Sequence, residues 1–159
     1  MKAMIFAAGL GTRLRPLTDN MPKALVPVAG KTMLERVILK LKDASFHDIT
    51  INIHHFGSQI IDFLRANQNF GVDIHISDER GELLDTGGGI KKARPLLESN
   101  EPFLIHNADI LTDLDLNAFY HHHLESDADA TLLTNHRKTS RYLLMDQDNR
   151  LCGWTNIST

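Results

Sequence analysis

Glycines and basic side chains gather in one segment near the start of the chain. A strand-like apolar run ends at Ala7, and two glycines, Gly9 and Gly11, follow it two residues apart. Glycine lets another group approach the main chain closely, and successive backbone N–H groups in such a loop form a concavity that favours phosphate oxygens. Arg13 adds a planar, permanently charged guanidinium, and Lys23 adds a mobile point charge. These residue types at this spacing predict the binding of a phosphorylated ligand.

Two common phosphate-binding motifs do not fit this segment. The dinucleotide-binding fingerprint needs glycine or alanine three residues after the second glycine, where this chain has Leu14. A Walker A loop needs glycine five residues before Gly-Lys-Thr, and Gly30-Lys31-Thr32 is preceded at that distance by Leu25. Two glycines alone would indicate only a turn with solvated charges. The failed fingerprint counts against an α/β oxidoreductase, which is one alternative function.

Two later segments also carry candidate ligand-binding groups. The run Gly87-Gly88-Gly89 opens a predicted helix, and the free N–H groups at a helix start favour anions. Asp109 closely follows an apolar, strand-like run. A lone aspartate after a strand is usually a turn or cap residue. A ligand-binding role is favoured only if Asp109 lies at the edge of the sheet where the strands end.

Strands and helices are expected to alternate along the chain. The expected strands are 2–7, 49–54, 72–76, 102–106, 130–134, 142–145 and 150–154, and the expected helices are 33–44, 58–67, 90–97 and 116–124. A turn at Asp148-Asn149 is expected to join the last two strands. The alternation predicts an α/β fold, a Rossmann-like three-layer αβα sandwich with a mostly parallel central sheet. Ligands of such sheets bind at the carboxyl ends of the strands, here the loops after Ala7, His54, Ile76 and His106.

Length and composition restrict the function classes. The chain has 159 residues, 42% hydrophobic and 23% charged, which suits one folded domain. Its formal net charge of −3 does not match the basic footprint of a nucleic-acid binder. The apolar run at the start is too short to span a membrane and lacks the features of a signal peptide. A single cysteine excludes an internal disulfide and fits a reducing, cytoplasmic setting.

The glycine-rich segment resembles the signature of the sugar-1-phosphate nucleotidyltransferase family. The resemblance is dense over residues 1–34 and extends through residue 113, and it is carried by the ordered set Gly9, Gly11, Arg13, Pro16, Thr18, Pro22, Lys23 and Pro27. Ile51-Asn52, Gly57, Gln59-Ile60 and the glycine run are most similar to the uridylyltransferases of N-acetylmuramate 1-phosphate, which belong to bacterial cell-wall recycling. Mannose-1-phosphate guanylyltransferases share much of the pattern.

The resemblance implies roles for individual residues. The residues implied to bind the nucleotide are Ala8, Gly9, Leu10, Gly11, Thr12, Arg13, Lys23, Glu79 and Gly87. Glu79 is the weaker candidate among them. The residues implied to bind the sugar are Thr86, Gly88 and Asn107. Asp109 matches a magnesium-binding aspartate that the family usually places after glycine; this chain has Ala108 there. Arg13, Lys23 and Asp109 are the expected catalytic residues.

The implied reaction transfers a nucleoside monophosphate from a nucleoside triphosphate, UTP or GTP favoured, to a sugar 1-phosphate, and releases pyrophosphate. The partners implied are these two substrates and Mg²⁺, without nucleic acid or membrane. The family supplies a second metal-binding aspartate from a later segment, so residues 1–159 are expected to be a catalytic domain that lacks its C-terminal part. The alternative is a degenerate or truncated nucleotide-binding module without turnover. The oligomeric state stays open.

Overall fold

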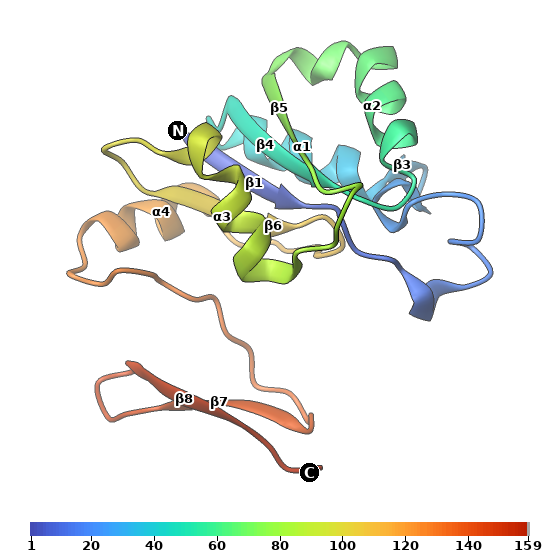
Figure 1. The fold of residues 1–159 in the computed structure, drawn as a ribbon. Coiled ribbons are helices and arrows are strands. Elements are labelled where there is room, and N and C mark those ends of the chain that lie inside the picture. The colour runs from blue at the N-terminus through green and yellow to red at the C-terminus, as the bar shows by residue number, and fades with distance from the viewer. Residues whose placement is uncertain (159) are drawn as a thin grey trace. The chain divides into compact units, whose positions relative to one another are not determined.

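A four-stranded parallel sheet organises the first part of the chain (Figure 1). The computed structural model describes residues 1–158. The sheet has the order β5-β4-β1-β6, formed by β1 (Lys2–Phe6), β4 (Asp48–Ile53), β5 (Asp73–Asp78) and β6 (Phe103–Asn107). All three pairings are parallel. This confirms the predicted sheet, including the expectation that these four strands end at one edge.

Helices cover both faces of this sheet. Ala3 and Ile5 of β1 belong to the larger hydrophobic cluster, to which α1 (Met33–Asp43), α2 (Gly57–Ala66) and α4 (Leu116–Leu124) also contribute buried side chains. Met4, on the opposite face of the same strand, packs with Ala93 and Leu97 of α3 (Asp85–Leu97). Successive strand residues face opposite sides, so the alternation along β1 separates the two helical layers. The predicted three-layer sandwich is confirmed.

Local sequence explains where two of the helices begin. The Thr32 side chain accepts a hydrogen bond from the backbone N–H of Glu35, which caps α1. The Asp115 carboxylate caps α4 by accepting from the N–H groups of Asn117 and Ala118. The predicted core positions of α1 are all buried, namely Leu34, Val37, Ile38 and Leu41.

The structure corrects two expected elements. Helix α3 begins at Asp85, so the three glycines lie within its first turns rather than before a helix at residue 90. Residues 130–134, which were expected to form a strand, have no regular secondary structure and belong to none of the sheets in the described part of the chain. Two short strands were not predicted, β2 (Pro27–Val28) and β3 (Lys31–Thr32), which pair antiparallel between the glycine loop and α1.

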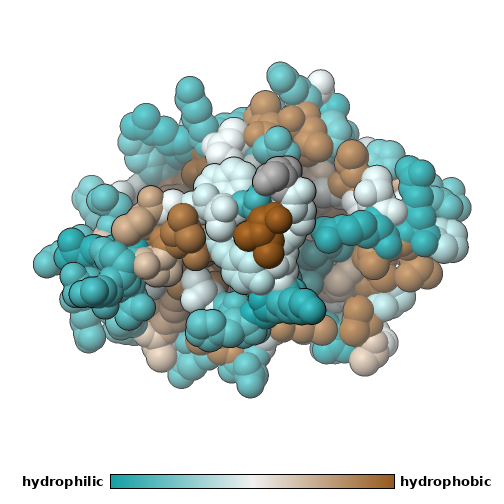
Figure 2. Space-filling model, turned by 90° about the horizontal axis from the view of Figure 1, so that it is seen from below, coloured by the Kyte–Doolittle hydropathy of each residue, from teal (hydrophilic) through white to brown (hydrophobic). Residues whose placement is uncertain are grey.

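The chain divides into two compact units, one over Met1–Asp127 and one from Ala128 onwards. The second unit contains an antiparallel hairpin of β7 (Arg141–Met145) and β8 (Leu151–Asn156). Its turn contains Asn149 at a positive φ of 59°, which confirms the predicted turn at 148–149. Many of its apolar side chains are exposed. Figure 2 shows the protein from below, with hydrophobic and hydrophilic residues interspersed on the visible surface. No helix within residues 1–158 has the length and apolar character needed to cross a membrane.

Candidate functional site

A cavity of about 200 Å³ opens at the carboxyl edge of the parallel sheet. Its lining comes from the ends of β1, β4, β5 and β6 and from the start of α3, and comprises Phe6, Ala8, Gly9, Asn52, Glu79, Leu83, Asp85, Thr86 and Asn107. Five of these were predicted from the sequence as ligand-binding residues, namely Ala8, Gly9, Glu79, Thr86 and Asn107. The structure therefore brings together residues from three of the four predicted loop regions, those after Ala7, Ile76 and His106, and β4 contributes Asn52 from within the strand.

Gly11 fixes the path of the loop that follows β1. Its φ of +67° is in the left-handed region, where glycine carries no steric cost. Its carbonyl accepts hydrogen bonds from the Thr18 hydroxyl and from the N–H of Leu14, both at 2.9 Å. A Cβ at this position would lie 3.0 Å from Lys23 Cβ and from Thr18 Cγ2. The absent side chain thus allows the loop to pack directly against the segment that carries Lys23.

The remaining predicted residues of the loop face solvent. Leu10, Thr12 and Arg13 are exposed and do not line the cavity. Thr12 and Arg13 belong to a 3₁₀ turn (Thr12–Leu14) that begins directly after Gly11. Arg13 is therefore solvent-exposed and outside the lining of the cavity.

Lys23 and Asp109 form an ion pair at this edge of the sheet. Lys23 lies in a 3₁₀ turn (Lys23–Leu25), and Asp109 follows β6. The backbone N–H of Ala108 donates to the carbonyl of Phe6, at 3.0 Å, which continues the pairing of β1 with β6 up to Asp109. The side chains of Lys23 and Asp109 are 23% and 36% exposed, so both charges remain accessible to a ligand. This pairing places two of the three predicted catalytic charges together.

Asn52 and Glu79 form a buried polar pair beneath the cavity. Asn52 is 2% exposed and Glu79 is completely buried. The Asn52 amide donates to Glu79 Oε1 at 2.8 Å, and Asn52 Oδ1 accepts from the N–H of Ala7 at 2.7 Å. The carbonyl of Glu79 also lies 2.6 Å from Nδ1 of His54. Both side chains are thereby held by backbone groups of the loops around the cavity.

The start of α3 borders the cavity, but its glycines contribute unequally. Thr86 lines the cavity, whereas Gly87 and Gly88 do not. Gly87 is exposed, and a Cβ at Gly88 would lie 2.9 Å from Leu84 Cβ. A Cβ at Gly89 would lie 2.9 Å from Glu79 Oε1. Close packing on Glu79 explains Gly89, while the predicted ligand contacts of Gly87 and Gly88 stay predictions.

Sequence reasoning did not assign four residues that line the cavity: Phe6, Asn52, Leu83 and Asp85. The signal for Asn52 was present, because it is an amide in the otherwise apolar end of a buried strand, Ile49–Ile53. A buried amide needs hydrogen-bond partners, so its position predicts a polar neighbour. Phe6 is the last residue of β1, whereas Leu83 and Asp85 depend on the path of residues 79–86, which no local pattern of the sequence defines.

Two side chains near the site have perturbed ionisation. Burial lowers the pKa of the His106 imidazole below its ordinary value, and the Lys40 charge lowers it further; the hydrogen bond with the Asn107 carbonyl and the charge of Asp109 oppose the shift. Hydrogen bonds from Arg80 lower the pKa of the Asp78 carboxyl to about 2. His106 is therefore held neutral beside the segment that carries Asp109.

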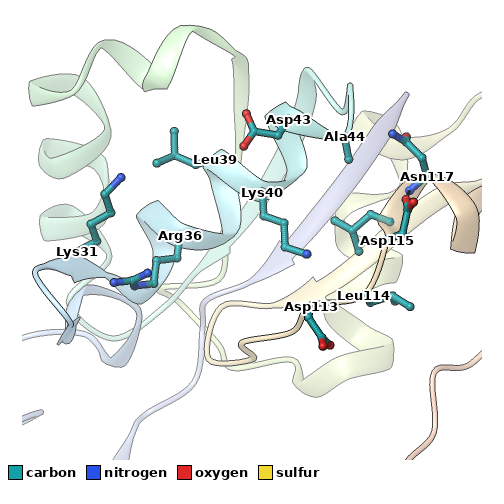
Figure 3. Close-up of a pocket in the computed structure, with 11 residues that line it drawn as sticks. Lys31, Arg36, Leu39, Lys40, Asp43, Ala44, Asp113, Leu114, Asp115 and Asn117 are labelled. Carbon is teal, nitrogen blue, oxygen red and sulfur yellow. Dashed lines mark hydrogen bonds between the residues drawn. The ribbon is translucent and has the colours of Figure 1, made fainter.

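A larger cavity of about 560 Å³ lies elsewhere, between α1 and residues 113–117 (Figure 3). None of the predicted site residues lines it. Several of its charged groups already have partners: Arg36 donates to the carbonyls of Val28 and Ala29, and Asp115 caps α4. The smaller cavity is the candidate site because it lies where parallel sheets bind ligands.

Among residues 1–158, no three His, Cys, Asp or Glu side chains are grouped closely enough to hold a metal ion by themselves. Asp109, which pairs with Lys23 and does not line the cavity, offers one partly exposed carboxylate at this edge of the sheet. Mg²⁺ is commonly held by one or two carboxylates together with substrate phosphates. The donor set therefore fits an ion that a phosphorylated ligand shares.

Comparison with known proteins agrees with the family resemblance of the sequence. The family model described as nucleotidyl transferase matches residues 2–152. The chain is 48% identical over 120 residues to the N-acetylmuramate alpha-1-phosphate uridylyltransferase of Neisseria meningitidis, covering 76% of this chain and 52% of that protein. It is 47% identical over 109 residues to the protein of the same name from Caulobacter vibrioides, covering 67% and 45%. This chain thus spans about half the length of these curated relatives.

Solved structures agree with the fold. The structure of HddC from Yersinia pseudotuberculosis complexed with GMP-PN superposes with a TM-score of 0.78 at 27% identity, over 98% of this chain and 68% of the other. UDP-glucose pyrophosphorylase complexed with UDP-glucose has a TM-score of 0.63 at 21% identity, over 77% and 54%, and supports the fold alone. The match over residues 2–152 and the identity to curated relatives show that the chain belongs to the nucleotidyl transferase family, among the sugar-1-phosphate nucleotidyltransferases.

Proposed function

We propose that this protein transfers the uridylyl group of UTP to N-acetylmuramate 1-phosphate and releases pyrophosphate. The observation that carries the proposal is the pairing of Lys23 with Asp109 beside the glycine loop, at the carboxyl ends of β1 and β6. Two relatives with 47–48% identity are named for this reaction. GTP with mannose 1-phosphate is the second candidate pair, since guanyltransferases are also similar and the HddC structure contains GMP-PN.

In this proposal the triphosphate, the nucleoside and the sugar bind at separate positions of the site. The triphosphate lies along the loop and contacts Ala8, Gly9, Leu10, Gly11, Thr12, Arg13 and Lys23. The nucleoside contacts Gly87 and the region of Glu79, and the sugar contacts Thr86, Gly88 and Asn107. The cavity lined by Gly9, Thr86 and Asn107 supports this division, because it joins the loop to the start of α3.

The chemistry needs positioning and charge neutralisation. An anionic oxygen of the sugar phosphate attacks the α-phosphorus of UTP, the new P–O bond forms, and the bond to the β-phosphate breaks as pyrophosphate leaves. The nucleophile is already ionised, so no general base is required. Lys23 and Arg13 stabilise the charge that develops on the leaving pyrophosphate. Lys23 is held for this role by the close packing of Gly11.

We infer that Asp109 holds Mg²⁺. Its carboxylate is a hard oxygen ligand, and its partial exposure lets substrate phosphates share the ion. When bound, the ion neutralises charge on the phosphate oxygens. We place the reaction in the cytoplasm, because the single cysteine, Cys152, is exposed and forms no internal disulfide.

Pyrophosphate release tests the proposal. The protein is incubated with Mg²⁺ and each of UTP, GTP, CTP, dTTP and ATP against N-acetylmuramate 1-phosphate, mannose 1-phosphate and glucose 1-phosphate. Release with UTP and N-acetylmuramate 1-phosphate supports it, and release with another pair corrects the substrates. Thermal stabilisation by UTP or GTP with Mg²⁺, but not by NAD, without release from any pair would identify a nucleotide-binding module without turnover.

A further inference from the structure

Glu79 is a buried carboxylate whose two oxygens are already engaged within the protein. It is completely buried, its Oε1 accepts from the Asn52 amide at 2.8 Å, and its Oε2 accepts from the backbone N–H of Leu84 at 3.3 Å. No positively charged side chain is paired with it among the described residues. A buried carboxylate is tolerated when hydrogen bonds satisfy its oxygens. Both oxygens of Glu79 thus serve contacts within the protein.

Asn52 extends this network to the other side of the cavity. Its Oδ1 accepts from the N–H of Ala7, at 2.7 Å, where β1 passes into the glycine loop. Leu84 directly precedes α3. The chain of hydrogen bonds therefore runs from the start of the glycine loop, through Asn52 and Glu79, to the start of α3.

Helix α3 packs directly on this pair because Gly89 has no side chain. A Cβ at Gly89 would lie 2.9 Å from Glu79 Oε1 and 3.2 Å from Asn52 Nδ2. The distance between the loop and the helix is consequently set by the two polar side chains between them. In a reaction that depends on the alignment of two substrates, such a distance affects the rate.

We propose that Asn52 and Glu79 are positioning residues, which form a hydrogen-bonded bridge that fixes the position of the glycine loop relative to the start of α3. This proposal rests on the proposed function, since the loop carries the triphosphate and α3 borders the sugar. Although both residues line the cavity, the hydrogen-bonding atoms of their side chains are engaged within the protein, so Glu79 acts through Leu84 and Asn52 acts through Ala7.

A reciprocal exchange of side chains tests the bridge. The Glu79→Gln side chain carries one oxygen and one NH₂ group. In either orientation of this amide, the NH₂ group faces another donor, either the N–H of Leu84 or the amide of Asn52, so one hydrogen bond is lost. In Asn52→Asp, two carboxylates of like charge face each other. In the double variant all three hydrogen bonds can form again: the new carboxylate at 52 accepts from Ala7 and from the new amide at 79, whose oxygen accepts from Leu84. The matched control is Glu82→Gln, the same change at an exposed position of the same segment.

The measured quantities are kcat and KM for UTP and for the sugar phosphate, together with the unfolding midpoint of each variant. We expect each single variant to lose on the order of tenfold to a hundredfold in kcat/KM for both substrates, and Glu82→Gln to keep the wild-type value. The double variant should recover to within about threefold of wild type, since no bond of the bridge is then missing. Recovery of kcat as well as stability supports positioning.

Two results would overturn the bridge. Single variants that keep wild-type kinetics would show that the relative position of the glycine loop and α3 does not depend on the bridge. A double variant that regains its unfolding midpoint but not its activity would show that the Glu79 carboxylate contacts the substrate itself. Failure of the proposed function is distinguishable, because wild type would then release no pyrophosphate.

In that case the bridge is tested by amide hydrogen exchange of Ala7 and Leu84. Faster exchange at both amides in each single variant, with recovery in the double variant, supports the bridge. Unchanged exchange rejects it.

Discussion

Lys23 and Asp109 are 86 positions apart in the sequence, yet their side chains meet. Their meeting follows from the parallel pairing of β1 with β6, which sets Phe6 opposite Asn107. The cation comes from the loop that follows one strand and the anion from the end of its neighbour. A charged pair in this position is accessible to an anionic ligand, in contrast to the buried Asn52–Glu79 pair.

Replacing Lys23 by alanine should remove most of the turnover and leave the fold intact. The ammonium group is expected to stabilise the leaving pyrophosphate, and loss of one such contact lowers kcat by on the order of a hundredfold to a thousandfold. Pyrophosphate release at saturating UTP measures the effect. Lys31→Ala is the matched control, because Lys31 is exposed and pairs with Glu35 across one turn. Undiminished turnover in Lys23→Ala would remove Lys23 from the catalytic residues.

His106 gives the folded protein a pH dependence. Its pKa is lowered by burial, so the unfolded chain binds a proton at this histidine more readily than the folded protein does. The folded state therefore loses stability as the pH falls through about 6.5, the ordinary histidine value. Urea unfolding at pH 8 and pH 5 should show a smaller loss in His106→Asn than in wild type. The exposed His122→Asn is the control, and an equal loss in all three proteins would contradict the assignment.

The alternation of strands and helices was sufficient to predict that the segments carrying Gly9 and Asp109 lie at one edge of the sheet, because strand ends of a parallel sheet share an edge. The resemblance to the family, and no local pattern, gave Ala8, Thr86 and Asn107. Patterns of this kind could not show that Glu79 has its oxygens occupied. Neither could they place Asn52 beside it. Those facts depend on how residues 79–86 cross the end of the sheet, which is decided by tertiary packing.

The elements themselves were largely predictable from hydrophobic periodicity. The buried positions of α1 at spacings of three and four residues and the apolar run of β1 are strong local signals. The start of α3 was placed five residues too late, because three glycines have low helix propensity. The helix nevertheless includes them, and Gly89 is where it comes closest to the polar pair. Tertiary contact overrode propensity here.

The glycines of α3 should respond differently to alanine. Gly89→Ala would insert a methyl group 2.9 Å from Glu79 Oε1, and overpacking of this kind costs about 1–3 kcal/mol of unfolding free energy. Gly87→Ala meets no atom within 4 Å and should raise the unfolding free energy by about 0.5–1 kcal/mol through helix propensity. Urea unfolding of both variants measures the contrast. Equal effects of the two substitutions would mean that α3 does not pack on Glu79 as described.

The whole chain consists of two units with different internal packing. The unit over Met1–Asp127 contains both hydrophobic clusters, whereas large apolar side chains of the later unit, such as Leu143 and Trp154, are exposed. The composition of the chain predicted one domain, since composition averages over the two parts. The expectation that residues 1–159 form one catalytic domain stays a prediction.

Limited proteolysis should separate the units. Residues 125–140 contain no helix or strand, and Arg137 and Lys138 are exposed within them. Exposed irregular backbone is the preferred site of cleavage. Brief trypsin treatment is therefore expected to cut first after Arg137 or Lys138, and mass spectrometry identifies the fragments. Early cleavage within the parallel sheet or its helices would contradict this order of stability.

The place of β1 has a consequence for synthesis of the protein. It precedes the other three strands of its sheet along the chain, yet it lies inside the sheet, and its two neighbours end at residues 53 and 107. A ribosome adds about 5–20 residues per second, so one edge of β1 stays unpaired for several seconds after the strand has left the exit tunnel. An apolar strand with a free edge is a site for aggregation. The nascent chain is thus most in need of a chaperone before β6 emerges.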